Sequence, residues 1–479
     1  MGQKQNNIAI ALSGLALFGL GGYGLFLASK TALSASDLAQ GVAPNPQPAP
    51  QIIVEPQSVR ALPGQLDTVP MFNSNSPEWV KTEGILLSTL PPSGKKTPAA
   101  HLNFPFQGRF DLFVHHQTHE PKDRQTFYLG VMLHNPGSQP IKVDVLQAAT
   151  YLTQEAPYIK LPTYVDNPNN TVYAGPGDRV VTDILQGKRQ ASFPAQLVIP
   201  PNQSRMLLNH PMPVRGLEKP INGRSGYMRL SSSGQVHAAS LIMFAKKNAD
   251  GTERAPNLAE WQALLDQGNL SGPRDKAPTP PDQVGGQLIY GRVAGVAQGS
   301  RWQAQLSDRP GAKNLTIPAP GQAVSYAIST VRAGRLGTEQ SQAAKMLVRY
   351  PDTAYESHAN YGAEYNLTLP LFNPTQQSRK VALTLATPLK EDRLSQGGLR
   401  FRRPPFDFPF FRGTVRLRYS DNQGQLKTRY VHLWHRKGQV LEPLETITLP
   451  PNSSRSVQLD LIYPPDSTPP QVLTLKTEP

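Results

Sequence analysis

The sequence predicts an all-β protein made of two β-sandwich domains in tandem, with one short helix near 257–268 and an N-terminal transmembrane or signal helix. Three observations support this fold class. The 479 residues include 48 prolines and 38 glycines but only 17% charged residues, which suits loop-rich β domains. Beyond residue 51 the chain consists of short apolar or alternating runs separated by Pro, Gly and Asn. Two motifs recur in the same order in both halves.

An uninterrupted apolar run extends from Ile8 to Ser29. Its 22 residues would measure about 33 Å as a helix, which is enough to cross a bilayer core. Two interpretations stay open, a retained transmembrane anchor or a cleaved signal sequence, and several glycines within the run weaken the first. Lys4 predicts that residues 1–7 stay in the cytoplasm and that the rest is exported. We therefore expect an extracytoplasmic protein, either membrane-anchored or periplasmic.

The remaining chain divides into a spacer and two domains. Residues 30–51 are rich in Pro and Ala, and the prolines hold such a segment extended at roughly 3 Å per residue. Because the rest exceeds what one core normally serves, we expect a first β domain over 52–271, a linker over 272–283 and a second β domain over 284–479. The first domain carries the one helix that the sequence marks clearly.

Residues 257–268 carry the start and stop signals of a helix. Asn257 can cap it, Glu260 stands in the capping-box position, and Gly268 can end it. Leu and Trp side chains recur on one face, so we expect that face to pack onto a sheet.

The two halves resemble each other in sequence. Shifted by 238 positions, a strand followed by Asn135 and Pro136 lies over a strand followed by Asn373 and Pro374. Later, a Pro-Pro-Asn motif ending at Asn202 matches one ending at Asn452. We expect a duplicated β-sandwich in which Val131 to Val145 and Leu369 to Leu383 form equivalent hairpins.

Motifs for catalysis and cofactors are missing from the sequence. The chain contains no cysteine, which excludes disulfides, thiolate metal sites and a cysteine-linked lipid anchor. No phosphate loop or GxGxxG unit occurs, and Ser225 lacks the spacing of a nucleophile elbow. Glu356 with His358, or Asp111 with Glu120, could supply an acid and a base, but a chain this long offers such pairs by chance. We therefore predict no catalytic residues and no cofactor.

A histidine cluster offers the best metal candidates. His116 and His119 could approach one ion if the strand turns there. His115 and His116 are neighbours, however, and neighbours on a strand point to opposite faces. A solvated loop is the simpler interpretation, as it is for His432 and His435, so no metal site is predicted.

Basic residues gather near the C-terminus. Ten basic residues and two acidic ones lie between Arg400 and Lys437. If residues 420–425 turn a hairpin with Ser420 opposite Gln425, then Arg416 faces Arg429 and Arg418 faces Lys427, which is unfavourable unless an anion compensates. Phenylalanines interleave with the arginines just before this hairpin and could stack on sugars or enter a lipid interface. The candidate anion-binding residues are Arg402, Arg403, Arg412, Arg416, Arg418, Lys427 and Arg429.

The segment from Leu62 to His116 resembles a cyanobacterial family of uncharacterised proteins, the domain-of-unknown-function family three-three-seven-zero. The likeness continues through FPAQLVIPPNQSRMLLN, NGRSGYMRLSSSG, ERAPNLAEWQALL and YPDTAYESHANYG. The resemblance implies an envelope or periplasmic location in a photosynthetic bacterium, and it implies no activity and no functional residues.

These observations leave two functional hypotheses. The first is a non-enzymatic, membrane-anchored envelope protein that acts as a scaffold or binding module for an anionic cell-surface component. The second is a hydrolase that acts on wall or surface polysaccharide through a carboxylate pair. The expected partner is an anionic polysaccharide or a membrane lipid surface, with the membrane contacted through the N-terminal helix. Nucleic acid is not expected because the domains are exported, and the sequence leaves the oligomeric state open.

Overall fold

Strands dominate the computed structural model, which describes residues 49–283 and 285–479. Residues 50–479 form one compact unit. The chain is mostly β, as the sequence predicts, with two α-helices and three short 3-10 helices among the described residues. The run 8–29, expected as a transmembrane or signal helix, lies outside the described residues. Within the described ranges, no helix is both long and apolar enough to cross a membrane.

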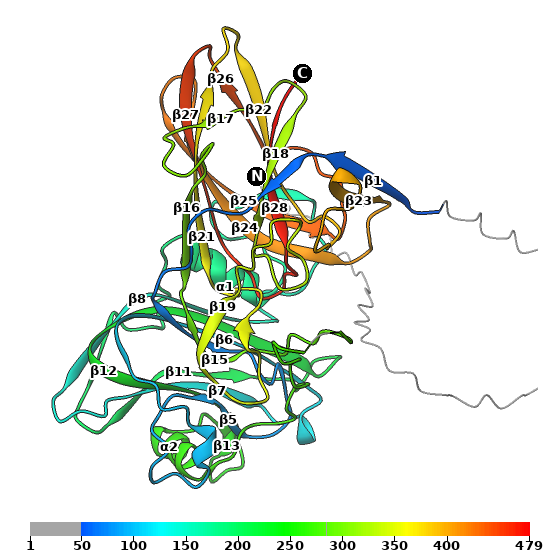
Figure 1. Ribbon diagram of the computed structural model, residues 1–479. Coiled ribbons are helices and arrows are strands. Elements are labelled where there is room, and N and C mark those ends of the chain that lie inside the picture. The colour runs from blue at the N-terminus through cyan, green and yellow to red at the C-terminus, as the bar shows by residue number, and fades with distance from the viewer. Residues whose placement is uncertain (1–48, 284) are drawn as a thin grey trace, which may run out of the picture. The chain divides into compact units, whose positions relative to one another are not determined.

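A 12-stranded sheet forms one end of the unit, drawn at the bottom of Figure 1. Its main path runs β10-β8-β12-β6-β3-β15-β19-β20. The 24-residue strand β12 passes from one layer to the other: its first half pairs with β6 and β8, and its second half pairs with β5 and β7. The two layers enclose a core in which Leu112 and Met228 share a cluster with Leu133 and Ile242. The strands are β3 Pro70–Ser74, β4 Trp79–Val80, β5 Gly84–Ser88, β6 Phe106–His119, β7 Phe127–His134, β8 Ile141–Leu152, β10 Gln196–Ile199, β11 Ser204–Met212, β12 Ile221–Phe244, β15 Ala294–Gln298, β19 Ala344–Arg349 and β20 Glu356–Ser357.

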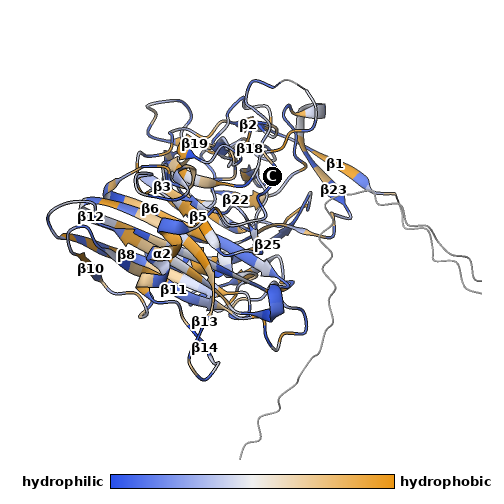
Figure 2. Ribbon diagram, turned by 90° about the horizontal axis from the view of Figure 1, so that it is seen from below, coloured by the Kyte–Doolittle hydropathy of each residue, from blue (hydrophilic) through white to orange (hydrophobic). Residues whose placement is uncertain are grey.

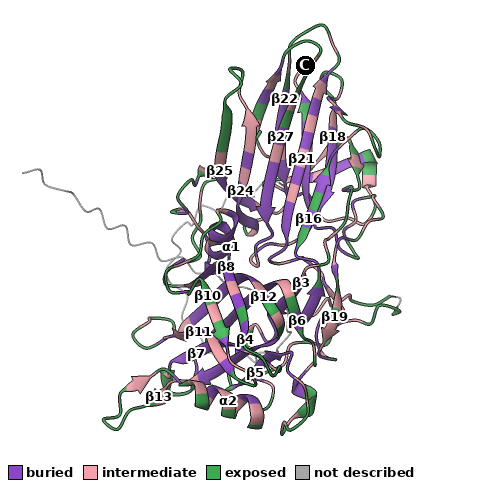
Figure 3. Cartoon of the chain, turned by 90° about the vertical axis from the view of Figure 1, so that its left-hand side faces the viewer, coloured by how far each residue is buried: buried purple, intermediate pink, exposed green. Residues whose placement is uncertain are grey.

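A 7-stranded and a 5-stranded sheet form the other end. Leu367 and Leu459 of the larger sheet share one apolar core with Val324 and Leu473 of the smaller one. Figure 3 shows the inner strands as mostly buried. The 7-stranded sheet contains β9 Tyr164–Asp166, β16 Arg301–Gln305, β17 Leu315–Thr316, β21 Glu364–Asn373, β24 Pro409–Ser420, β25 Leu426–Arg436 and β27 Ser453–Ile462, and the 5-stranded sheet contains β2 Ser58–Arg60, β18 Ala323–Ile328, β22 Arg379–Ala386, β26 Glu445–Leu449 and β28 Gln471–Thr477.

Two ribbons complete the strand inventory of the described chain. β1 pairs antiparallel with β23 and stands out from the side of the unit in Figures 1 and 2. β13 pairs with β14 at the end of the unit that contains the 12-stranded sheet. The bounds are β1 Gln51–Pro56, β23 Gly398–Arg403, β13 Lys246–Lys247 and β14 Glu253–Arg254, and the 3-10 helices are η1 Pro98–Ala100, η2 Lys122–Arg124 and η3 Ser395–Gly397.

Several strands lie in a sheet built mainly by the other half of the sequence. β15 and β19, which follow the expected linker 272–283, extend the 12-stranded sheet beyond β3. In the opposite direction, β1, β2 and β9 pair with strands of the second half. The two ends of the unit are therefore tied together by backbone hydrogen bonds, not only by a linker.

The helix α2, Leu258–Gln267, confirms the sequence signals at both ends. The Asn257 side chain accepts a hydrogen bond from the Glu260 amide, the Glu260 carboxylate accepts one from the Asn257 amide, and Gly268 ends the helix. Trp261 and Leu265 face a cluster that includes Leu241 of β12. The capped helix thus covers the outer face of a sheet, as expected.

The helix α1, Pro176–Leu185, was not predicted from the sequence. It lies buried between the two ends of the unit, against β8 and β12 on one side and β24 and β27 on the other (Figure 3). Its start, Pro176 and Gly177, carries the residues that usually mark a turn. Val180, Val181 and Ile184 nevertheless provide an apolar stripe at helical spacing, and the helix is stable because both ends of the unit bury it.

The two Asn-Pro turns are built alike but do not form hairpins. The Asn135 amide donates to the carbonyls of Gln139, Ile199 and Pro200 at 2.8, 3.0 and 3.1 Å. The Asn373 amide makes the corresponding bonds to Gln377, Leu449 and Pro450 at 2.7, 3.1 and 2.9 Å. The expected hairpins are wrong, because β7 pairs with β11 and β12 while β8 pairs with β10 and β12, and β21 and β22 likewise have separate partners. Each turn carries the chain from one layer to the other.

Candidate functional site

The hairpin of β24 and β25 has a different register from the one that the sequence analysis assumed. Arg416 lies opposite Tyr430, and Leu417 lies opposite Arg429. The loop has five residues instead of four, because the Asp421 carboxylate accepts hydrogen bonds from the amides of Gln423 and Gln425 at 2.9 and 3.0 Å. The predicted facing cations are therefore wrong, and the unfavourable pairing from which an anion was inferred is not present.

Asp460 forms ion pairs with two of the candidate cations. Its Oδ2 lies 3.0 Å from Nε of Arg416 and 3.0 Å from Nη2 of Arg418. Its Oδ1 accepts a hydrogen bond from Asn366 at 2.7 Å. Asp460 is 2% exposed and sits on β27, directly beside Arg416 in the sheet. Burial lowers the pKa of Arg416, but Asp460 and Tyr430 together outweigh the effect of burial, so the pKa is raised overall.

Acids also pair with the cations on β25. Arg429 contacts Asp166 of β9 at 2.9 Å and Glu445 of β26 at 2.5 Å. Lys427 lies 3.4 Å from Asp421 in the hairpin loop. Asp166 and Glu445 lie outside the stretch from Arg400 to Lys437, so a count of charge within that stretch could not find them.

Arg412 is the fifth paired candidate. Its Nη2 lies 3.7 Å from Asp466, and its guanidinium stacks over Tyr158 at 5.0 Å. Among the seven candidate residues, Arg402 and Arg403 are left without a carboxylate at ion-pair distance in the described chain. The structure does not gather the seven into one anion site.

Arg402 and Arg403 belong to a smaller surface in which cations cover phenylalanine rings. The Arg402 guanidinium lies 4.4 Å from the centre of the Phe406 ring, and Lys437 lies 5.0 Å from the same ring. Phe408 is 42% exposed and lies 5.6 Å from its neighbouring rings on either side. We name this surface the basic aromatic face, and it consists of Arg402, Arg403, Lys437, Phe406, Phe408 and Phe410.

The basic aromatic face lies where the described chain enters its first strand. Gln51 pairs with Arg403, and Ile52 pairs with Arg402, in the ribbon of β1 and β23. Ile52 is itself 41% exposed. The spacer predicted over 30–51 therefore joins the folded unit beside two of the cations on this face.

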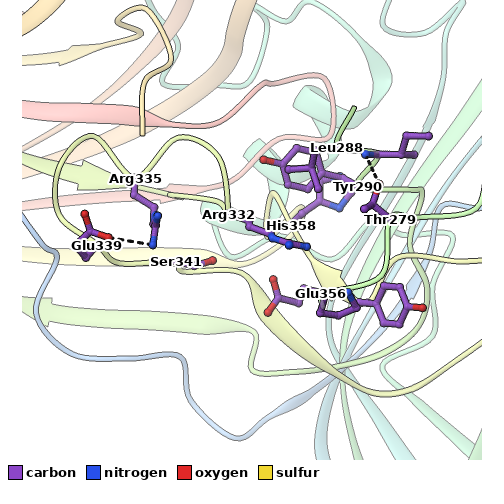
Figure 4. Close-up of a pocket in the computed structure, with 12 residues that line it drawn as sticks. Thr279, Leu288, Tyr290, Arg332, Arg335, Glu339, Ser341, Glu356 and His358 are labelled. Atoms are coloured by element: carbon purple, nitrogen blue, oxygen red, sulfur yellow. Dashed lines mark hydrogen bonds and ion pairs between the residues drawn. The ribbon is translucent and has the colours of Figure 1, made fainter. Parts of the chain in front are cut away.

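Close to the basic aromatic face lies a pocket, which Figure 4 shows. It has a volume of about 380 Å³. Its walls are formed by residues from 279–281, 288–290 and 332–341, together with β20 and the residues beside it. Lys390 lies between the pocket and the basic aromatic face. The Lys390 Nζ is 3.5 Å from the Tyr290 hydroxyl of the pocket, and the charge of Lys437 on the face lowers the pKa of Lys390. The lining residues are Thr279, Pro281, Leu288, Ile289, Tyr290, Arg332, Arg335, Glu339, Ser341, Tyr355, Glu356 and His358.

Burial shifts the titratable groups of this pocket. It raises the pKa of Glu356, against the opposing charges of Arg332 and then Lys345. It lowers the pKa of His358 to about 4, so the imidazole is neutral near pH 7. The pair that the sequence analysis named as an acid and a base, Glu356 and His358, thus lines one pocket. Burial and the neighbouring Lys437 also lower the pKa of Lys390 to about 8.

The other acid pair is separated. Asp111 and Glu120 lie nine residues apart, at either end of an extended stretch of about 30 Å. Asp111 is fully buried between the two ends of the unit, where Arg229 links it to Glu364 at 3.5 and 2.6 Å respectively. Tyr227 donates to Asp111 at 3.0 Å. This network joins the two ends of the unit and offers no opening for a substrate.

The histidine candidates do not converge on one site. The buried ring of His116 bonds to Ser74 at 2.9 Å and to the Pro77 carbonyl at 2.7 Å. His119 lies three residues along the strand, on the other face, with its ring against Trp79. No group of three His, Asp or Glu residues suited to a metal occurs in the described ranges.

Buried strands contain the remaining histidine candidates, His115, His432 and His435, together with the Ser225 motif. Ser225 is hydrogen-bonded to His115 at 2.7 Å, but both lie within strands and are at most 2% exposed, so no substrate can reach them. His432 is fully buried against Asp178 of α1 at 2.7 Å, and burial lowers the pKa of His435 to about 3. The solvated loops that the sequence analysis expected at these positions are therefore wrong.

Comparisons with solved structures give only distant likenesses. The chain is similar to the crystal structure of Lac15 from a marine microbial metagenome, with 9% identity and a TM-score of 0.10, over 78% of this chain and 53% of that one. It is also similar to the structure of the Macrobrachium rosenbergii nodavirus, with 10% identity and a TM-score of 0.13, over 94% and 97% of the two chains. The chain thus spans about half the length of the Lac15 chain, and at these TM-scores neither likeness bears on the fold.

A comparison with curated proteins finds no match. The family model described as "Protein of unknown function (DUF3370)" matches residues 57–477. This range contains every strand of the 12-, 7- and 5-stranded sheets, the pocket and the basic aromatic face, and β1 lies just before it. The resemblance found in the sequence is thereby confirmed at the level of the family, and the protein belongs to this family of unknown function.

Proposed function

We propose that the protein is a non-enzymatic, extracytoplasmic envelope protein that acts as a scaffold and binds anionic lipid headgroups through its basic aromatic face. The observation that carries this proposal is that Arg402 and Lys437 lie over the Phe406 ring, with Arg403 next to Arg402 at the end of β23. None of the three cations has a carboxylate at ion-pair distance in the described chain, because Asp407 of the same loop lies near Lys160 and Arg436 instead. The apolar run 8–29 is the proposed membrane anchor. The cations on β24 and β25 are not part of the proposed surface.

The scaffold is proposed to be a duplicated β-sandwich. Strand order supports this, because β10-β8-β12-β6-β3 at one end corresponds to β26-β22-β28-β18-β2 at the other. In both series the last pair is parallel and the others are antiparallel. The matching Asn135 and Asn373 turns occupy the same place in each series. Two copies joined through shared strands would give a rigid platform.

The chemistry of the face supports a lipid surface as its partner. Cations attract anionic headgroups, and each basic residue near a membrane surface contributes about 1 kcal/mol. Exposed aromatic side chains such as Phe408 insert at the boundary between headgroups and acyl chains. Lys160 lies 3.9 Å from Asp407, which stands between Phe406 and Phe408 in the loop of the face. Its neighbour Ile159 is 45% exposed and adds apolar surface beside the face.

The position of the face supports the same partner. The spacer reaches the folded unit at Gln51, opposite Arg403. A tether that starts in a bilayer and ends at this face keeps it at a high effective concentration near the lipid. Weak contacts then suffice to hold the unit against the membrane.

Vesicle binding tests the proposal. Because residues 50–479 form one compact unit, this fragment is suitable and excludes the apolar run. We expect it to sediment with vesicles of phosphatidylglycerol and phosphatidylcholine at low salt, and not with phosphatidylcholine alone. Replacing Arg402, Arg403 and Lys437 with Gln should weaken binding about 100-fold, from about 1 kcal/mol for each charge.

A charge-matched control removes three exposed cations elsewhere, Lys142, Lys219 and Lys247. This variant should bind anionic vesicles within about threefold of the parent, since binding is assigned to one face and not to net charge. Equal loss in both variants, or binding that depends on neither, would refute the proposed surface.

A polysaccharide hydrolase is the second candidate, favoured by the raised pKa of Glu356 in the pocket. Glycosidases use two carboxyl groups on either side of the scissile bond. The other carboxylate of the pocket, Glu339, is already held by Arg335 at 3.1 Å. The pocket therefore supports binding better than hydrolysis.

A further inference from the structure

The pocket of Figure 4 contains two charged groups, Arg332 and Glu356, that have no ion-pair partner among the described residues. The Arg332 guanidinium donates to the carbonyls of Pro280 and Gln283 at 3.3 and 3.1 Å, which fixes its position on the wall. In the described chain it has no carboxylate at ion-pair distance. The Glu356 carboxylate likewise has neither an ion pair nor a hydrogen bond there. A donor group and an acceptor group thus remain open toward the same space.

These two groups act on each other without touching. Arg332 and Glu356 both line the pocket, and the charge of Arg332 opposes the rise in the pKa of Glu356 that burial causes. Figure 4 draws Arg332 between Glu356 and His358. A ligand placed between the guanidinium and the carboxylate would accept from the first and donate to the second, as a hydroxyl group does.

Flat rings form part of the wall. The rings of Tyr290 and His358 stack at 5.1 Å, and the buried Nδ1 of His358 has no hydrogen-bond partner among the described residues. Tyr355 lies beside Glu356 with Arg349 over its ring at 3.8 Å. Apolar rings combined with a few polar groups suit a ligand that has both CH faces and hydroxyls.

Charge and size narrow the class of ligand. The lining carries two cations, Arg332 and Arg335, and two acids, Glu339 and Glu356, so it favours neither an anion nor a cation. Its volume of about 380 Å³ is near the lower end of the roughly 300–1,000 Å³ typical of small-molecule sites. Such a pocket suits a small neutral ligand.

We propose that this pocket binds a neutral sugar residue, with Arg332 and Glu356 as its hydrogen-bonding groups and Tyr290 as part of its wall. A sugar hydroxyl can accept from Arg332 while another donates to Glu356. The pocket shares no residue with the basic aromatic face, so sugar binding can be tested independently of lipid binding. It would allow the protein to hold a surface glycan while the other face contacts lipid.

Saturation-transfer NMR on residues 50–479 tests the proposal with five defined probes: glucose, N-acetylglucosamine, maltose, cellobiose and glucuronate. At least one neutral sugar should show transfer at millimolar concentration. Glu356→Ala should weaken that binding about tenfold or more, because it removes a charged acceptor. Arg332→Met should have a similar effect, and Glu218→Ala, an exposed acid outside the pocket, should have none.

Thermal unfolding of each variant shows whether the fold is intact, and Glu356→Ala keeps the test decisive if loss of the Arg332 bonds disturbs the wall. Failure of all four neutral sugars to bind would overturn the proposal. So would tighter binding of glucuronate than of glucose, or binding that neither variant weakens. Vesicle binding should be unchanged in Glu356→Ala, which distinguishes this site from the lipid surface.

Discussion

The hairpin of β24 and β25 and the basic aromatic face draw their cations from the same basic stretch, yet the two regions treat them oppositely. On the hairpin, Arg416 and Arg418 share the buried carboxylate of Asp460. On the face, Arg402 and Lys437 lie over Phe406 instead. On the hairpin, acids of neighbouring strands such as Asp460, Asp166 and Glu445 reach the arginines. On the face, Asp407 lies near Arg436 and Lys160, and no carboxylate of the described chain lies at ion-pair distance from Arg402, Arg403 or Lys437. A run of positive charge is therefore not evidence of a binding site until its three-dimensional partners are known.

Removing Asp460 should have the largest effect on this contrast. Asp460→Asn leaves two guanidiniums that are 19% and 36% exposed without their carboxylate. Breaking a buried ion pair costs about 3 kcal/mol or more, so we expect about 3 kcal/mol lower stability in chemical unfolding.

The matched control for Asp460→Asn is Glu218→Gln, an exposed acid, which should change stability by less than about 0.5 kcal/mol. The triple Gln variant of Arg402, Arg403 and Lys437 should change the free energy of unfolding equally little. If Asp460→Asn were as mild as these, the hairpin cations would not be structural.

Asp421→Ala should have an intermediate effect. The substitution removes two hydrogen bonds to backbone amides and the contact with Lys427, all of them near solvent. We expect a loss of about 1 kcal/mol and increased amide exchange at Gln423 and Gln425. A loop that kept its protection would show that the strands alone fix its five-residue length.

Lys437→Gln should have the smallest effect, a change in titration. Lys437 adds to burial in lowering the pKa of Lys390, so its removal should raise that pKa above about 8, as NMR of the Lys390 side chain can measure. Because the folded pKa lies below the ordinary 10.5, the unfolded chain binds more protons between these values. Lys390 therefore costs stability below about pH 8, and the cost falls as pH rises toward 10.5.

The Lys437→Gln variant should show a shallower rise of stability over that pH window. An unchanged Lys390 pKa would mean that burial alone sets it. Arg416 is the opposite case, since its pKa is raised by its acid partner.

Features governed by local signals could be predicted from the sequence. The helix at 258–267 follows from Asn257 and Glu260, and the two Asn-Pro turns follow from side chains that bond within a few residues. The family and the predominance of strands were also visible. These features need no knowledge of which strands become neighbours.

Features governed by distant partners could not be predicted. The hairpin register depends on a five-residue loop, which Asp421 holds by hydrogen bonds across it. From sequence alone, this loop cannot be told apart from a four-residue loop with polar residues. Asp166 and Asp460 lie outside the basic stretch that they neutralise. The pocket joins segments on both sides of β18 and β19, so only the proximity of Glu356 to His358 along the chain hinted at it. No local sequence signal indicates that strands of one half pair with strands of the other.

That exchange constrains the order in which the protein can fold as it is made. β1, β2 and β3 emerge early, but β2 pairs only with β18, and β1 only with β23, which lie more than 250 residues further along the chain. At about 5–20 residues per second, the ribosome needs roughly 10–50 s to deliver that length. During this interval the N-terminal segment waits as unpaired backbone. The segment that is synthesised first is thus among the last to be paired, and neither half of the chain completes its sheets before the other has been synthesised.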